Sequence, residues 1–350
     1  YEWSKIEQQK SVSLSRDMAA STSLEDGEHD GLYLPYHYIA QVMVEGRPIN
    51  LYAKLKGLFG LTTGKLTQTF SAGLEWKMDK NYGRGQVYDP ARPITPGTPY
   101  RPRVYSDIPA MHQLGFYIQD LLAIPVGANV LTAQLGLRGN ALAHLPNNYD
   151  MRGKVYLDPR INVQWQLPKI EVAGKILAID LNGGWGRQTK FPTLLQLYPD
   201  KVYTDLIELN YYDLNPNYRR LYLRTYIDNP ANSQLGAAQN DKWEIRIGAQ
   251  CDGSSLSVTY FHEQLSNGFR ASTSAHPYYY KDYDEKQIDA SKLTAQPTLD
   301  HLHYTEKQVL GTYSMTTNGS KLVKEGIEWQ LATKRFDFIK TRLTINGAWF

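Results

Sequence analysis

The sequence has one cysteine and almost no excess charge. A single thiol, Cys251, excludes an internal disulfide framework and a cysteine-based zinc site. The 38 Lys and Arg residues nearly balance 35 Asp and Glu residues, so the formal net charge is only +3. Because nothing in this balance calls for a polyanionic partner, we expect no nucleic-acid binding.

Long hydrophobic runs are also missing. The one helix-like membrane candidate, residues 121–137, carries no charge but contains Pro125, Gly127, Asn129 and Gln134. A transmembrane helix needs about 20 predominantly apolar residues, whereas this stretch is typical of a strand, a tight turn and a second strand. The chain also opens without a basic segment followed by an apolar one, so we expect any secretory signal to lie upstream of Tyr1 or to have been removed.

Among the aromatic residues, tyrosine is abundant and phenylalanine is scarce. The chain has 26 Tyr against 9 Phe, in a composition that is 42% hydrophobic and 21% charged. A tyrosine has an apolar ring and a hydroxyl that prefers water, so it suits bilayer interfaces and binding surfaces. The composition therefore permits a large sheet and favours one of these two settings.

Residues 65–80, KLTQTFSAGLEWKMDK, keep a two-residue rhythm over their whole length. A period of two places the apolar side chains on one face of a strand. Strands of globular proteins usually have about five or six residues, whereas a tilted strand that crosses a membrane needs about 9–11. The segment therefore indicates a membrane-spanning strand. Its even positions include Leu66, Phe70, Ala72, Leu74, Trp76 and Met78.

Further alternating segments follow along the chain. In residues 242–252, for example, Trp243, Ile245 and Ile247 alternate with charged residues, which points the second face of the strand to water. The candidate strands are residues 33–44, 48–59, 65–79, 113–122, 129–138, 158–167, 172–184, 241–252, 254–264, 322–333 and 341–350.

The connections between these strands alternate in length. Outer-membrane barrels have short turns at one end and long loops at the other. We therefore predict an all-β fold, a transmembrane antiparallel up-and-down β-barrel. The long connections are 80–112, 139–157, 185–240 and 265–321, and the short ones are 123–128, 168–171, 252–254 and 334–340.

Four blocks resemble the β-barrel of TonB-dependent outer-membrane receptors of the type common in Bacteroidetes. They are GFYIQDLLAIPVGANVLTAQLGLRGN (115–140), YLDPRINVQWQL (156–167), LNGGWGRQTKFPTLLQLYPD (181–200) and KEGIEWQLATKRFDFIKTRLTINGAWF (324–350). The resemblance implies a 22-stranded barrel filled by an N-terminal plug. Residues 1–350 hold about half of those strands and no plug segment, so we interpret them as the barrel portion of a larger receptor. We expect the strand ending at Phe350 to continue into another loop.

No motif supplies catalytic chemistry, and we predict that the chain is not an enzyme. His301 and His303 share one face of an extended segment but lack a third metal ligand. The acidic run 281–285, KDYDE, lacks the ligand spacing of a calcium loop. The glycine-rich segment 183–190 misses the spacing of a phosphate-binding loop, and we expect a bend there. No metal site and no cofactor is therefore predicted.

Tyrosine and arginine gather in two of the predicted long loops. Rigid rings and guanidinium groups are enriched in recognition hot spots, although tyrosines also form interfacial girdles or pack one loop against another. The sequence therefore predicts a ligand-binding surface here. The predicted contacts are Arg219, Arg220, Tyr222, Arg224, Tyr211 and Tyr212 in 185–240, and Arg270 and Tyr279 in 265–321.

The resemblance implies an active transporter in the outer membrane of a Gram-negative bacterium. Such a receptor binds a scarce nutrient (siderophore, haem, cobalamin, glycan or peptide) and imports it with energy supplied by TonB. Its implied partners are the lipid bilayer, the TonB complex, the ligand and, as an optional one, a surface lipoprotein. The alternatives are a passive porin-like channel without a plug, and a soluble glycan-binding β-sheet protein. The soluble alternative would have to pack its second faces, which carry Lys65, Lys77 and Arg246.

Overall fold

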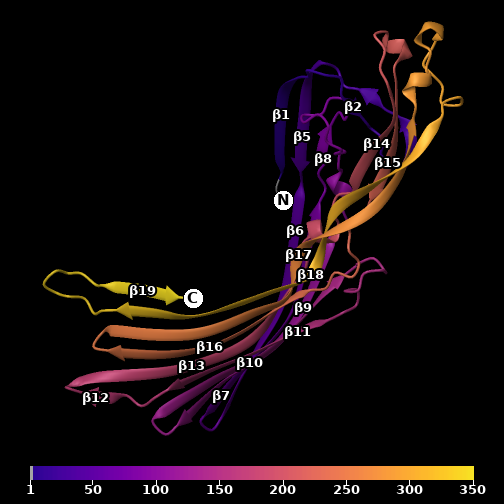
Figure 1. Ribbon diagram of the computed structural model, residues 1–350. Helices are drawn as coiled ribbons and strands as arrows, with labels where there is room; N and C mark the ends of the chain where they lie inside the picture. Colours follow the sequence, from indigo (N-terminus) through magenta and orange to yellow (C-terminus); the bar gives the residue numbers. More distant parts are fainter. Residues whose placement is uncertain (1–2) are drawn as a thin grey trace.

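The computed structural model describes residues 3–350, whose regular elements are almost all antiparallel strands (Figure 1). In the largest sheet, here called the main sheet, consecutive strands of the path pair side by side. No helix within residues 3–350 has the length and apolar character to cross a membrane. The main sheet contains β6 (Pro48–Thr63), β7 (Leu66–Asn81), β9 (Met111–Val126), β10 (Asn129–Ala143), β11 (Tyr156–Gln166), β12 (Ile170–Val172), β13 (Lys175–Lys190), β16 (Ala238–Cys251), β17 (Ser254–Tyr283), β18 (Tyr304–Ala332) and β19 (Thr344–Trp349).

Cross-strand register collects the apolar side chains on one face of the main sheet. Leu55 on β6 lies opposite Leu74 on β7, which lies opposite Phe116 on β9. Farther along the sheet, Ile245 on β16 lies opposite Tyr260 on β17. Leu55, Leu74 and Ile245 are 71%, 59% and 56% exposed. A sheet whose apolar face is left uncovered in this way suits a nonaqueous surrounding medium.

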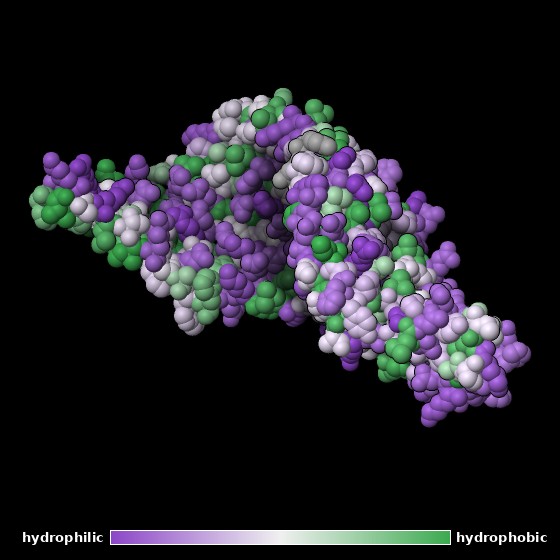
Figure 2. Space-filling model, turned by 90° about the horizontal axis from the view of Figure 1, so that it is seen from above, coloured by the Kyte–Doolittle hydropathy of each residue, from purple (hydrophilic) through white to green (hydrophobic). Residues whose placement is uncertain are grey.

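The other face of the main sheet is polar. Lys54 Nζ lies 2.9 Å from Glu75 Oε1, and Arg138 contacts the same carboxylate. Arg246 NH1 lies 3.3 Å from Asp180 Oδ2. Seen from above, hydrophilic side chains gather in the hollow of the molecule (Figure 2). The two faces therefore have the opposite polarities of a membrane sheet around a wet lumen.

The all-β antiparallel fold predicted from the sequence is confirmed. The path of the main sheet begins at β6 and ends at β19, and these two strands are not paired with each other. The main sheet is therefore open in this chain. The number of strands in a closed barrel stays a prediction.

At one end of the main sheet, tight turns join consecutive strands. Gly127 and Ala128 join β9 to β10, and Asp252 and Gly253 join β16 to β17. Asp252 and Gly253 have φ values of 47° and 78°, so both central residues are left-handed, as a type I′ hairpin turn requires. The long connections leave the opposite end of the strands (Figure 1). This confirms the prediction that one end has short turns and the other has long connections.

Residues 4–46 and the long connections together form further sheets, which we call the loop assembly. Its first sheet has the order β1 (Ser4–Ser13), β5 (His37–Gly46) and β8 (Gly85–Tyr88). Its second has the order β14 (Val202–Tyr211), β15 (Arg220–Asp228) and β3 (Gly27–Asp30), and β2 (Ala19–Ala20) pairs with β4 (Leu32–Tyr33). The predicted barrel strand 33–44 corresponds to β5. That assignment was wrong, because β5 pairs with β1 and β8.

The boundaries of two predicted loops were also wrong. Residues 265–321 are mostly strand, since β17 and β18 pair from Ser255 and Ala332 as far as Tyr283 and Tyr304. Outside a membrane neither face has to be apolar, so the sequence alternation ends while the backbone pairing continues. The connection is only 284–303, with η3 (Glu285–Gln287) and η4 (Ala290–Lys292). The loop predicted at 185–240 is 191–237 and contains α1 (Leu194–Leu197), β14, η2 (Pro216–Tyr218) and β15, while η1 (Tyr105–Asp107) lies in 80–112.

The loop assembly buries hydrophobic side chains, partly against the adjoining ends of main-sheet strands such as β10. Leu197 on the single turn α1 packs with Met151 and Leu142. Thr193 and Gln196 form a capping box at the start of this turn, which satisfies backbone N–H groups there. Because each cluster joins segments distant in sequence, the loop assembly has a core of its own. A second cluster contains Val12, Leu34, Tyr38 and Ala40.

Candidate functional site

The predicted contacts on β15 share one face of the β14–β15–β3 sheet. Side chains alternate along a strand, so Arg220, Tyr222 and Arg224 point the same way. Each contacts an acidic side chain on β3 or on Asp26, the residue just before it. Arg220 lies 3.1 Å from Asp30, the Tyr222 hydroxyl lies 3.3 Å from Glu28, and Arg224 lies 3.0 Å from Asp26. The positive charges of this face are therefore balanced within the protein.

This face packs against the β17–β18 hairpin. Lys281 Nζ lies 2.9 Å from Glu28 Oε1, and the Lys281 backbone N–H donates to Glu208 Oε1 at 2.8 Å. The Tyr226 hydroxyl donates to the carbonyl oxygen of Tyr279 at 2.5 Å. Glu208 is only 2% exposed, and this burial raises the pKa of its carboxyl. The predicted cluster thus lies at a packed junction between the β14–β15–β3 sheet and the outer part of the β17–β18 hairpin.

Three further predicted contacts lie where β14 turns into β15. The guanidinium carbon of Arg219 lies 4.1 Å from the ring centroid of Tyr212, a cation–π contact. Tyr33 packs edge-on against the same ring, with centroids 5.5 Å apart. Burial raises the pKa of Tyr33 to about 12 and also raises the pKa of Tyr211. The structure therefore brings Arg219 and Tyr212 together, and these rings hold the tip of the hairpin.

The last two predicted contacts lie on β17 and not in a loop. Tyr279 is 58% exposed, and its hydroxyl accepts from Gln308 Nε2 at 3.2 Å. Arg270 is also exposed but lies farther down the hairpin, in register with Thr317. Tyr279 therefore borders the cluster through Tyr226, whereas Arg270 lies apart from it.

The opposite face of the β14–β15–β3 sheet holds a buried ion pair that the sequence did not indicate. Arg101 NH2 lies 2.9 and 3.0 Å from the two carboxylate oxygens of Asp205. Arg101 Nε donates to the carbonyl oxygen of Ser23 at 2.9 Å, and the Thr225 hydroxyl donates to Asp205 Oδ1 at 2.6 Å. Arg101 is 7% exposed. Because the partners lie 104 positions apart in the sequence, no local pattern could reveal the pair.

A cavity of about 490 Å³ adjoins this ion pair and lies between the two loop sheets. Gln86 and Tyr88 on β8 line one side, Tyr203 and Asp205 on β14 line the other, and the proline-rich segment 90–99 closes the space. Both this cavity and its neighbour fall in the size range of small-molecule sites, about 300–1,000 Å³. The neighbouring cavity, of about 900 Å³, shares Gln86, Pro99, Tyr100 and Tyr203 with it.

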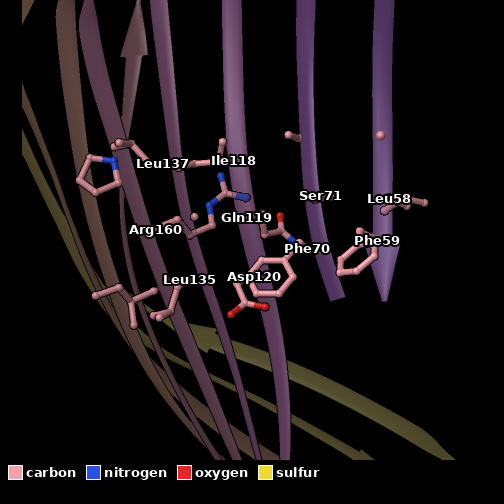
Figure 3. A pocket seen from close by; sticks show the side chains of 15 residues that line it. Leu58, Phe59, Phe70, Ser71, Ile118, Gln119, Asp120, Leu135, Leu137 and Arg160 are labelled. Atoms are coloured by element: carbon pink, nitrogen blue, oxygen red, sulfur yellow. The ribbon is translucent and has the colours of Figure 1, made fainter. Parts of the chain in front are cut away.

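An apolar groove of about 830 Å³ opens on the main sheet and shares no lining residue with the cavity between the two loop sheets (Figure 3). Phe59, Phe70 and Ile118 line it. Asp120 lies beside Phe70 in Figure 3, and Gln68 Nε2 donates to its carboxylate at 3.3 Å. The phenylalanines and Ile118 belong to the exposed apolar face, so this groove suits hydrocarbon chains rather than a water-soluble ligand.

The remaining motifs form no recognisable site. Within residues 3–350, no group of three or more His, Cys, Asp and Glu side chains is placed to hold a metal ion. His301 and His303 lie in the connection 284–303 between β17 and β18. The glycine-rich segment 183–190 continues the regular strand β13, so the bend expected there was wrong.

The comparisons with known proteins give a family and two similar structures. A family model described as "TonB dependent receptor-like, beta-barrel" matches residues 9–348. The siderophore receptor PirA from Acinetobacter baumannii is similar at 16% identity and a TM-score of 0.49, over 98% of this chain and 40% of that one. A variant of the ferric enterobactin receptor PfeA from Pseudomonas aeruginosa is similar at 18% identity and a TM-score of 0.46, over 86% of this chain and 34% of that one.

The chain spans less than half the length of these two receptors. No curated protein matches it. The family model, in contrast, matches residues 9–348, which is nearly the whole chain. The chain belongs to the TonB-dependent receptor-like β-barrel family.

Proposed function

We propose that the chain forms part of an outer-membrane transporter that binds a scarce nutrient and imports it with energy delivered through TonB. The observation that carries this proposal is the family match over residues 9–348. The main sheet supports it, because an apolar face suits the lipid of a Gram-negative outer membrane and a polar face suits a wet lumen. The loop assembly then forms the binding region at the outer end.

The proposed transporter works by binding and passage and forms no covalent intermediate. A wide, polar lumen would leak, so a plug domain must fill it and must change conformation to open a path. We assign residues 1–350 to the barrel and the plug to another part of the receptor. The candidate nutrients are a siderophore, haem, cobalamin, a glycan or a peptide, and a surface lipoprotein is a further candidate partner.

The eight residues predicted from the sequence remain proposed ligand contacts, with unequal access. Tyr279 and Arg270 are exposed and can meet a ligand directly. Arg220 and Arg224 already pair with Asp30 and Asp26, so an anionic ligand would have to displace these carboxylates. We therefore expect Tyr279 to matter more for affinity than Arg220, and Arg220 to matter more for holding the loop assembly together.

Uptake in the full-length receptor tests the proposed function. Cells that carry it should take up one of the candidate nutrients only when TonB is present, whereas a passive porin would conduct without TonB. Uptake that does not change when TonB is deleted would contradict the proposal and favour the porin.

Single alanine variants test the proposed contacts. Tyr279→Ala should weaken binding of the transported nutrient at least tenfold, the size of an ordinary hot-spot loss. Asn217→Ala, on the exposed turn η2, serves as the matched control and should bind normally. Equal affinities of the two variants at equal surface levels would remove Tyr279 from the site.

A further inference from the structure

We propose that the 490 Å³ cavity between the two loop sheets binds a neutral, ring-containing part of the transported ligand. This inference rests on the proposed uptake function and adds a place and a chemical class to it. The cavity lies on the face of β14 and β15 that carries Asp205 and Leu223, opposite to the face of Arg220 and Arg224. The two faces differ in charge, in packing and in free space.

The cavity offers no free charge to a ligand. Its lining, all of it within the described residues, includes no Lys, Arg or His, and its one carboxylate is Asp205. Arg101 contacts both oxygens of that carboxylate, and Thr225 donates to one of them. A charged group that entered would lose its hydration without gaining an opposite charge. A neutral ligand is therefore favoured over an anionic or a cationic one.

The walls of the cavity are flat and stiff. Tyrosine and proline rings lose little conformational freedom when a ligand binds, and a tyrosine ring stacks well on another ring. Tyr203 is held in place by the guanidinium of Arg101, which lies 4.9 Å from its ring centroid. Such a preformed space with flat surfaces suits a cyclic group. The ring side chains in the lining are Tyr88, Pro90, Pro93, Pro99, Tyr100 and Tyr203.

One buried hydroxyl of the lining residues has no hydrogen-bond partner among residues 3–350. It is the Oη of Tyr88, which is buried, and burial raises the pKa of this hydroxyl, so it stays neutral and able to donate at ordinary pH. A buried polar group without a partner is costly, and a ligand or an ordered water would satisfy it. A ring that carries a hydroxyl or carbonyl oxygen would therefore fit the cavity better than a plain hydrocarbon ring.

Three probes with the same ring and different charge test this inference. Benzyl alcohol, benzoate and benzylammonium are titrated into the detergent-purified, full-length receptor and followed by ligand-detected NMR. Benzyl alcohol should bind at least tenfold more tightly than either charged probe. Thr95→Trp places a large ring in the cavity lining and should weaken benzyl alcohol at least tenfold, whereas Asn217→Trp on the exposed turn η2 should not.

A second variant tests the hydroxyl without changing the volume of the cavity. Tyr88→Phe should weaken benzyl alcohol about threefold and leave toluene unchanged, and it serves as the test of location if Thr95→Trp fails to reach the membrane. Tighter binding of a charged probe, or binding that neither variant alters, would overturn the inference. Absence of TonB-dependent uptake would instead refute the proposed function, and TonB-dependent uptake without any binding of benzyl alcohol would refute only the cavity inference.

Discussion

The main sheet and the loop assembly are both built of antiparallel strands, but they place their leucines in opposite ways. Leu55 on β6 is 71% exposed, whereas Leu221 on β15 is 2% exposed. The main sheet also extends its strands to 14–16 residues in β6, β7, β9, β10, β13 and β16, while the sheets of the loop assembly use shorter strands. Strand formation alone therefore does not distinguish a membrane region from a region in water. The two kinds of region differ instead in whether the apolar side chains lie on an exposed face or in a buried core.

The difference follows from the solvent of each region. In water, burying a leucine side chain contributes about 1.5–3 kcal/mol. In a bilayer the lipid tails are as apolar as leucine, so an apolar residue has no need to be covered by protein. A buried ion pair such as Arg101 and Asp205 is tolerated only where geometry and hydrogen bonds compensate the lost hydration. Substitutions should therefore separate the two regions.

The largest effect should come from breaking the buried ion pair of the loop assembly. Arg101→Met leaves Asp205 buried without its cation, which should cost about 3–5 kcal/mol of local stability. Hydrogen exchange should then accelerate in β14 and β15 but not in β7 or β9. Adding Asp205→Leu should recover most of the loss.

Arg92→Met provides the control for that experiment, because Arg92 faces Asp89 at 4.0 Å on the surface and exposed pairs contribute about 0–1 kcal/mol. If Arg101→Met accelerated exchange equally in the main sheet and the loop assembly, the two regions would be one cooperative unit.

Removing core volume from the loop assembly should have the next largest effect. Leu221→Ala should destabilise the β14–β15–β3 sheet by about 2–5 kcal/mol, since the leucine is fully buried. Leu214→Ala, at a side chain that is 91% exposed, should change stability by less than about 0.5 kcal/mol. Limited proteolysis of segment 191–237 measures both. Equal resistance of the two variants would mean that this sheet does not depend on its core.

A charge on the apolar face of the main sheet tests where the membrane lies. Ile245→Arg should cost about 2–4 kcal/mol if residue 245 lies near the bilayer midplane, measured as the equilibrium for folding into lipid vesicles. Leu310→Arg is matched in kind and lies on the extended part of β18, where the side chain is 68% exposed. It should cost less than about 0.5 kcal/mol, as a surface substitution does. A similar cost for both would place the extended hairpin in lipid.

The smallest effect is the pH dependence of stability at the tight turn between β16 and β17. Lys175 and Lys334 hydrogen-bond to Asp252 at 2.8 and 2.9 Å and lower the pKa of its carboxyl from the ordinary 3.8 to about 2. Because the folded pKa is lowered, the stabilisation is complete above about pH 4 and is lost as the pH falls toward 2. Carboxyl NMR should follow this titration, and Asp252→Asn should remove the pH dependence. Titration near 3.8 would show that the two lysines do not hold the turn.

Much of the main sheet could be predicted from the sequence, because its medium imposes a local pattern. Trp243, Ile245 and Ile247 face outward as the alternation indicated, with 37%, 56% and 54% exposure. The predicted strand 241–252 is β16, Ala238–Cys251. Both follow from the period of two, which requires only neighbouring residues.

The loop assembly could be predicted only in part. Composition drew attention to Arg219, Arg220 and Tyr222, but it gave no sign that Arg220 would pair with Asp30, 190 positions away. The Arg101–Asp205 pair and the cavity beside it likewise depend on contacts between distant segments, here 104 positions apart. Such contacts are set by the three-dimensional path of the chain and produce no periodic pattern in the sequence. Whether the eight predicted residues bind ligand stays a prediction.

The β17–β18 hairpin also has a consequence for the order in which the chain folds. Its tip pair, Tyr283 and Tyr304, encloses a loop of about 20 residues, whereas its base pair, Ser255 and Ala332, spans nearly four times as many. Closing the larger loop first would cost about 1 kcal/mol more in chain entropy than closing the smaller one. Pairing that starts at the tip makes every later pair a local event. The outer end of this hairpin can therefore act as the nucleus from which pairing advances toward the turns at the other edge of the sheet.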